Sequence, residues 1–133
     1  MKTDQLMFGA AYYPEYMPYD RMEADFSMMK KAGINTIRVA ESTWSTLEPR
    51  DGEFDFTFID RILEEAQKWE MSVIVGTPTY AVPSWLAQKD PDVLVVNSKG
   101  QEKYGHRQIF DLLNPTFRFH AERIIEVLVS HTA

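Results

Sequence analysis

The sequence predicts an α/β fold built on a parallel sheet, and three observations lead to this prediction. Short apolar runs of strand length alternate with longer stretches whose apolar residues recur at helical spacing. Most connections between these runs are short, and neither a linker nor an internal repeat interrupts the alternation. Strands that alternate with helices are joined by crossovers and therefore run parallel. With 133 residues the chain has room for one domain, so we expect a single domain over residues 1–133.

Three strands are expected, and the first is apolar on both faces, as suits a parallel strand covered by helices. The first covers residues 6–13 and ends at Pro14. The second begins at Ile34 and is rich in β-branched residues. The third covers residues 72–76. The sheet is therefore expected to use three strands within the first 76 residues.

Helical periodicity places one helix at residues 21–32 and another at residues 58–69. Asp20 is expected to cap the first helix, with Glu23 completing a capping box, and Thr57 is expected to cap the second. The apolar residues of the first helix form one stripe that predicts its core-facing side: Met22, Phe26 and Met29.

Regular order loosens after the third strand. A short helix is expected at residues 84–88, and a long connection follows at residues 92–113, with a short strand at 93–96. Long connections between regular elements are usually functional. The final helix is expected to start with Asn114 as its cap.

The composition excludes several classes of function. The formal charge of −6 and the lack of a Lys/Arg cluster argue against a nucleic-acid partner. No segment is long and apolar enough to suggest a membrane span or a signal peptide. The chain has no cysteine, which rules out disulfides and thiolate metal sites. We therefore expect a soluble cytoplasmic protein that binds neither nucleic acid nor membrane.

Two architectures fit this order of elements, a doubly wound sheet and part of a (β/α)8 barrel. A dinucleotide site needs a glycine-rich turn after the first strand, whereas residues 12–18 are bulky and include Glu15. In a barrel, functional residues follow the C-terminal ends of the strands. Those positions hold Tyr12, Tyr13, Glu15, Arg38, Glu41, Trp44, Thr77, Thr79, Tyr80, Trp85, His106 and Arg107. This mixture of rings, carboxylates and arginines suits a carbohydrate, while a simple Arg38–Glu41 ion pair beside a packing Trp44 remains the alternative.

Several motifs in order along the chain resemble the N-terminal part of the family 42 glycoside hydrolases, the β-galactosidases. They are Tyr12-Tyr-Pro-Glu15, Gly33-Ile-Asn-Thr-Ile-Arg-Val-Ala-Glu41, Trp44-Ser-Thr-Leu-Glu-Pro49, Gly76-Thr-Pro-Thr79, Pro83-Ser-Trp-Leu86 and Asn114-Pro-Thr-Phe-Arg118. The resemblance implies a (β/α)8 catalytic barrel, of which this chain would supply the first three βα units. It also implies hydrolysis of terminal non-reducing β-D-galactosides with retention by the full-length protein, and a trimeric assembly.

The resemblance also implies roles for individual residues. Arg38 and Arg107 match arginines that contact the galactose, and Glu41 matches an acidic position that gives the site polar support. The family's acid/base glutamate follows strand four and its nucleophile follows strand seven. Neither has a matching position here, so no catalytic residue is assigned and the 133-residue chain is expected to be inactive by itself.

The sequence departs from the family at the cysteine cluster that binds zinc in many members, where Asp111 stands and no cysteine exists. No metal or cofactor is therefore expected. His120 and His131 on the last helix are expected to be ordinary surface residues. Two other hypotheses stay open: a non-catalytic fragment that binds sugar or assembles with another chain, and a small hydrolase that uses Glu15 and Glu41 as its carboxylate pair.

Overall fold

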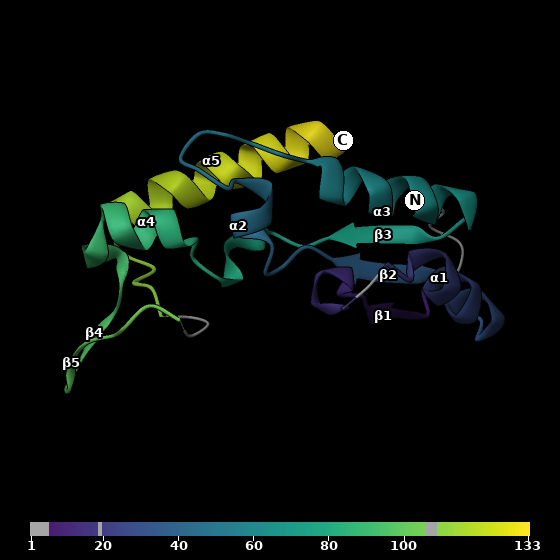
Figure 1. Cartoon of the computed structure of the whole chain (residues 1–133), viewed down its shortest axis with the longest axis horizontal. Helices are drawn as coiled ribbons and strands as arrows, with labels where there is room; N and C mark the ends of the chain where they lie inside the picture. Colours follow the sequence, from purple (N-terminus) through teal and green to yellow (C-terminus); the bar gives the residue numbers. More distant parts are fainter. Residues whose placement is uncertain (1–5, 19, 106–108) are drawn as a thin grey trace. The chain divides into compact units, whose positions relative to one another are not determined.

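The structure is a computed structural model that describes residues 6–18, 20–105 and 109–133 (Figure 1). The chain divides into two compact units. The sheet unit consists of the described residues of Met1–Ala40 together with Phe56–Gly76. The helical unit consists of Glu41–Asp55 together with the described residues of Thr77–Ala133.

The sheet unit contains a parallel sheet with the strand order β1-β2-β3. Its strands are β1 (Gly9–Ala11), β2 (Thr36–Val39) and β3 (Ser72–Val75), which confirms the parallel sheet predicted from the sequence. Arg38 pairs in register with Ala11 on one side and with Ile74 on the other. The sheet is open in the part of the chain that the structure describes, with β1 and β3 at its edges.

The first strand is shorter than the predicted range of residues 6–13. Before Gly9, the Asn35 side chain contacts the chain directly: its Oδ1 accepts from the Phe8 N–H at 2.9 Å, and its Nδ2 donates to the Leu6 carbonyl at 2.8 Å. At Gly9 the two strands approach so closely that a Cβ would lie 2.4 Å from the Thr36 carbonyl oxygen. Glycine is therefore needed where the ladder starts.

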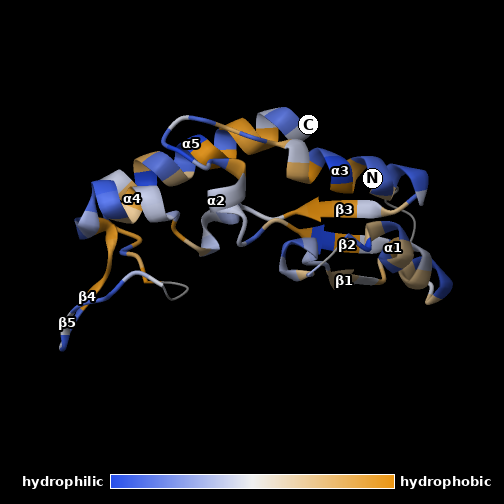
Figure 2. Cartoon of the chain, viewed as in Figure 1, coloured by the Kyte–Doolittle hydropathy of each residue, from blue (hydrophilic) through white to orange (hydrophobic). Residues whose placement is uncertain are grey.

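Two helices of the sheet unit lie close to the predicted ranges: α1 (Met22–Lys31) and α3 (Thr57–Lys68). They contact each other, and α3 also packs against β3. Figure 2 shows β3 as mostly hydrophobic and α3 as carrying both hydrophobic and hydrophilic residues, as expected for a helix that covers a sheet. The buried apolar residues described in this unit are Tyr12, Phe26, Ile37, Val39, Ala40, Ile59, Ile62, Ala66 and Met71.

The predicted helix caps at these two sites are wrong. Arg21 occupies the cap position of α1, and Phe56 occupies that of α3. Asp20 still accepts from the Met22 N–H at 3.3 Å, but its other oxygen binds the Arg61 side chain at 2.6 Å. Asp20 therefore stands one residue before the cap position and is paired with Arg61.

The helical unit contains α2 (Trp44–Leu47), α4 (Ser84–Lys89) and α5 (Pro115–Thr132). The short 3-10 helices η2 (Pro78–Tyr80) and η3 (Pro91–Val93) precede and follow α4, and η1 (Pro14–Tyr16) belongs to the sheet unit. A small antiparallel hairpin joins β4 (Val96–Asn97) to β5 (Gly100–Gln101). The main buried apolar residues of the helical unit are Trp44, Leu47, Leu86, Val93, Ile109, Phe117, Ile124 and Leu128.

The cap of the last helix agrees with the prediction. The Phe117 N–H donates to Asn114 Oδ1 at 3.0 Å, and Pro115 stands in the first turn. Asn114 also donates from Nδ2 to the Asp92 carbonyl at 3.0 Å, which ties the start of α5 to η3. No helix in the described parts of the chain has the length and apolar character needed to cross a bilayer.

Candidate functional site

Arg38, the strongest candidate from the sequence, lies on β2 with its side chain on the exposed face of the sheet. Its backbone is held by the neighbouring strand, because the Tyr12 N–H donates to the Arg38 carbonyl at 2.8 Å. A depression of about 450 Å³ lies over this face and is lined by Met7, Gly9, Ala10, Ala11, Thr36, Ile37, Arg38 and Ile74. The small side chains of β1 leave room beside the guanidinium for a polar ligand.

The end of β1 is anchored by a buried polar contact. The Tyr12 hydroxyl donates to Asp25 Oδ2 at 3.3 Å, and Arg21 Nε donates to Asp25 Oδ1 at 2.6 Å. Burial, followed by the charge of Asp25, raises the pKa of Tyr12 well above its usual range, so this phenol stays neutral. The Tyr12 ring meets Phe26 edge-on with 5.7 Å between centroids. These contacts fix the point at which the chain leaves β1 toward Glu15.

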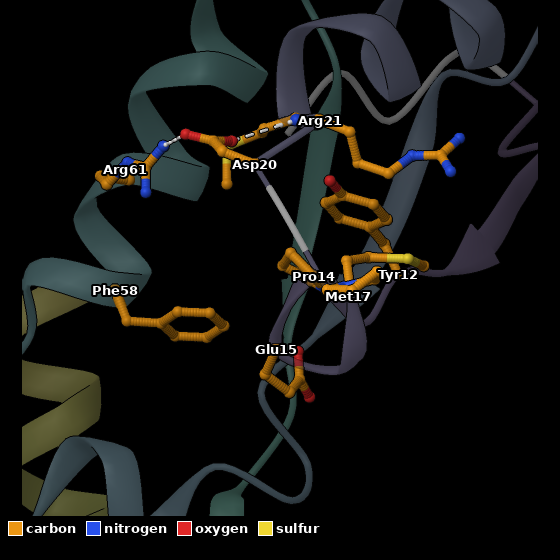
Figure 3. A pocket seen from close by; sticks show the side chains of 10 residues that line it. Tyr12, Pro14, Glu15, Met17, Asp20, Arg21, Phe58 and Arg61 are labelled. Atoms are coloured by element: carbon orange, nitrogen blue, oxygen red, sulfur yellow. Dashed lines mark hydrogen bonds and ion pairs between the residues drawn. The ribbon is translucent and has the colours of Figure 1, made fainter.

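A cavity of about 320 Å³ lies between the turn after β1 and helix α3 (Figure 3). Glu15 and Pro14 border it on one side, and Phe58 and Arg61 from α3 border it on the other. Arg61 binds Asp20 at 2.6 Å, and this contact lowers the pKa of Asp20. The charge of Arg61 is therefore balanced within the cavity wall.

Glu41 lines a pocket in the helical unit. The residue before it, Ala40, has a φ of 81°, an uncommon left-handed conformation for a residue other than glycine. The Tyr80 N–H donates to the Glu41 carbonyl at 3.3 Å. The pocket has a volume of about 580 Å³ and is lined by Glu41, Thr77, Thr79, Tyr80, Phe110 and Leu112. Hydroxyls, a carboxylate and aromatic rings in one pocket suit a hydroxylated ligand that also has apolar C–H faces.

Trp44 is fully buried, which agrees with core packing, the alternative that the sequence left open for this residue. Its indole Nε1 donates to Glu48 Oε2 at 2.9 Å, and Glu48 is also fully buried. The sequence identified Glu48 only as part of a family motif. Its spacing of four residues from Trp44, which places both side chains on the same face of a helical turn, is the signal that would have pointed to this contact.

Comparison with known proteins identifies the family. The model of glycoside hydrolase family 42, described as β-galactosidase, matches residues 11–133. This chain belongs to glycoside hydrolase family 42.

Family 42 relatives match nearly the whole chain. The β-galactosidase BgaH of Haloferax lucentense is 36% identical over 126 residues, which is 94% of this chain and 19% of that protein. The β-galactosidase of Thermus thermophilus is 32% identical over 92% of this chain and 19% of its own length. The structure of the Rahnella sp. R3 β-galactosidase matches with a TM-score of 0.90 and 31% identity over 98% of this chain and 20% of that one. The chain therefore spans about a fifth of the length of these family members.

The family 42 resemblance assigned three candidate residues. Two of them fall in different units, and the third lies outside the described residues. Arg38 belongs to the sheet unit and Glu41 to the helical unit. Arg107 and its neighbour His106 are not among the described residues. In the described ranges, no group of three or more His, Cys, Asp or Glu residues is placed to hold a metal ion.

His120 corrects one expectation from the sequence. It was predicted to lie on the helix surface, but only 4% of it is exposed. Its ring packs edge-on against Trp85 at 5.2 Å and against Phe119 at 5.1 Å between centroids. Burial, together with the charge of Arg123, lowers the pKa of His120, so its neutral form is favoured. His131, by contrast, is exposed as predicted.

Asp51 connects α4 and α5 through two cations. It accepts from Lys89 Nζ at 2.5 Å and from Arg123 Nη2 at 2.8 Å, and His120 Nδ1 lies 3.8 Å away. The hydrogen bond from Lys89 and then that from Arg123 lower the pKa of Asp51 to about 2. The charged form of Asp51 therefore stabilises the fold.

Replacing Asp51 with asparagine is expected to reduce the loss of stability at acid pH. The folded pKa lies below the ordinary value of about 3.9, so the contribution is fully present above pH ~4 and disappears as the pH falls toward about 2. Urea unfolding at a series of pH values should show a shallower slope in this window for Asp51→Asn. The exposed Asp92→Asn should keep the wild-type slope, and equal slopes for wild type and Asp51→Asn would contradict the assignment.

Proposed function

We propose that this chain provides the galactose-binding part of a retaining β-galactosidase that hydrolyses terminal non-reducing β-D-galactosides. In this proposal residues 1–133 all belong to one (β/α)8 catalytic domain, as its N-terminal portion. The strands β1, β2 and β3 are the first three of the barrel, followed by α1, α3 and α5 respectively. Family membership and the parallel order of the three strands support this assignment.

The observation that carries the proposal is the position of Arg38 on the exposed face of β2. A planar guanidinium donates several hydrogen bonds and does not titrate, which suits the hydroxyls and ring oxygen of a sugar. We assign Arg38 and Arg107 to binding the galactose and Glu41 to polar support of the site. Glu41 lies in a pocket with two threonines and Tyr80, a composition that suits a hydroxylated ligand.

The isolated chain is proposed to bind without hydrolysing. Retaining glycosidases need two carboxyl groups about 5 Å apart, one as the nucleophile and one as the proton donor. By the family resemblance, both glutamates follow later strands of the barrel and match no residue here. A cytoplasmic location and a trimeric assembly of the full-length enzyme stay predictions, as does the alternative carboxylate pair of Glu15 and Glu41.

A second candidate function is assembly with another chain as a non-catalytic fragment. The observation that favours it is the apolar surface next to the open sheet. Leu6 is 87% exposed, Phe8 54% and Ile74 41%, and β1 is an edge strand of the described sheet. Sedimentation of the 133-residue chain separates the two ideas, because association without galactoside binding would favour assembly.

Titration of the chain with methyl β-D-galactoside, followed by the NMR amide shifts, tests the proposed function. Arg38→Ala is expected to weaken binding about 10- to 100-fold, because hydrogen bonds to a charged donor are lost. Arg38→Lys should recover only part of the affinity, since it keeps the charge without the planar fork. The matched control is Arg50→Ala, which removes an arginine from an exposed ion pair with Glu53.

Two results would contradict the proposal. Wild-type affinity in Arg38→Ala would remove Arg38 from the galactose site. Hydrolysis of a chromogenic galactoside by the purified 133-residue chain would contradict the assignment of catalysis to later strands.

A further inference from the structure

We propose that Glu48 is a positioning residue for the Glu41 pocket. Glu48 holds the indole of Trp44, and Trp44 in turn contacts Phe117, whose ring stacks on Phe110 in the wall of that pocket. All these residues belong to the helical unit. The inference rests on the proposed function only in naming a galactoside as the ligand of the pocket.

The Glu48 carboxylate is bound on both oxygens while fully buried. Oε2 accepts from Trp44 Nε1 at 2.9 Å, and Oε1 accepts from the Gly52 N–H at 2.8 Å and from Arg123 Nη2. Its backbone carbonyl accepts from Trp85 Nε1 at 2.9 Å. A buried carboxylate with this many donors has one geometry available to it, because any rotation would leave a charged oxygen unpaired. The orientation of the Trp44 indole is therefore fixed by a charged partner.

Two aromatic contacts connect the Trp44 indole to the pocket. Its ring lies 6.1 Å from that of Phe117, tilted by 58°. Phe117 stacks on Phe110 with 4.5 Å between centroids and only 17° between the ring planes. Phe110 lines the pocket beside Glu41. A shift of the indole would therefore displace the Phe110 ring in the pocket wall, because closely packed rings move together.

The backbone around Phe110 is also held in place. Phe110 bridges to Leu94, the Val95 N–H donates to the Ile109 carbonyl at 2.8 Å, and the Asp111 N–H donates to the Val93 carbonyl at 2.8 Å. With its backbone tied on both sides, Phe110 can adjust mainly through its ring, whose neighbour is Phe117. The shape of the pocket beside Glu41 thus depends on Glu48.

The test compares Glu48→Gln with Glu53→Gln. Both replace a glutamate by its amide in the segment after α2, but Glu53 is exposed and pairs with the exposed Arg50 at 3.0 Å. Glu48→Gln is expected to shift the indole N–H resonance of Trp44 and the amide resonances of Phe110 and Leu112. It is also expected to weaken methyl β-D-galactoside binding about three- to tenfold. Glu53→Gln should leave these resonances and the affinity at wild-type values.

A second variant, Trp44→Phe, keeps an aromatic ring against Phe117 but removes the N–H that donates to Glu48, together with part of the indole ring system. This variant replaces Glu48→Gln in the test if Glu48→Gln does not fold. It should shift the Phe110 and Leu112 amide resonances and weaken galactoside binding by a smaller factor than Glu48→Gln. Unchanged Phe110 and Leu112 amides in a folded Glu48→Gln chain would overturn the inference and leave Glu48 with a stabilising role alone.

Galactoside affinity and amide chemical shifts distinguish the proposed function from the positioning role of Glu48. If wild type shows no galactoside binding, the proposed function fails. The positioning role is then decided by whether Glu48→Gln moves the Phe110 and Leu112 amides, which needs no ligand. If wild type binds and Glu48→Gln binds equally well, the proposed function stands and the positioning role fails.

Discussion

Replacing Arg123 with alanine is expected to lower the free energy of unfolding by about 3–5 kcal/mol. Arg123 is the charged partner of the fully buried Glu48, and it also donates to Asp51 at 2.8 Å. Removing it leaves a carboxylate buried without a compensating charge, which costs more than the loss of one hydrogen bond. Urea unfolding followed by circular dichroism measures the change.

The control for this prediction is Arg118→Ala, an exposed arginine of the same helix, which should change stability by less than about 0.5 kcal/mol. The double variant Glu48→Gln with Arg123→Ala should recover part of the loss, because the buried negative charge is gone. An Arg123→Ala chain as stable as Arg118→Ala would show that Glu48 gains nothing from its cationic partner.

Replacing Phe26 with alanine is expected to cost about 3–5 kcal/mol of unfolding free energy. Phe26 is fully buried on α1, and its ring meets Tyr12 edge-on at 5.7 Å. The substitution leaves a cavity between the helix and the end of β1, although alanine itself favours the helix. Thermal and urea unfolding of the variant would measure the loss.

Met28→Ala is the matched control for Phe26→Ala, since Met28 lies on the same helix and is 52% exposed. It should change stability by less than about 0.5 kcal/mol. Comparable losses in the two variants would mean that α1 does not bury Phe26 against Tyr12 in solution.

The elements predicted most accurately are those whose signals are local. The stripe that contains Phe26 placed α1 to within one residue at each end, and Asn114 was correctly identified as the cap of α5. The three parallel strands also follow from apolar runs that need no knowledge of distant residues. The predicted cap of α1 was wrong by one residue: Arg21 holds the cap position, and Asp20 before it binds Arg61, far along the chain.

In the candidate site, too, features with a local sequence signal were predicted and features that depend on distant residues were missed. Arg38 was found from its place at the end of an apolar strand, and it does lie on the exposed sheet face. The burial of His120 was missed, because a helix surface position looks the same in sequence whether or not Trp85 packs over it. The pocket wall at Phe110 likewise depends on a ring stack with Phe117 on the next helix.

Periodicity, turn residues and family motifs in the sequence were sufficient for the α/β class, the parallel strands and the family, because these signals arise between residues that are near in the chain. The role of Glu48 emerged only from the folded chain. Its partner Arg123 lies 75 residues away, and a glutamate in a turn reads as a solvated surface residue until that arginine is brought to it. Only tertiary packing turns this carboxylate into a buried, fully bound group whose charge has a partner.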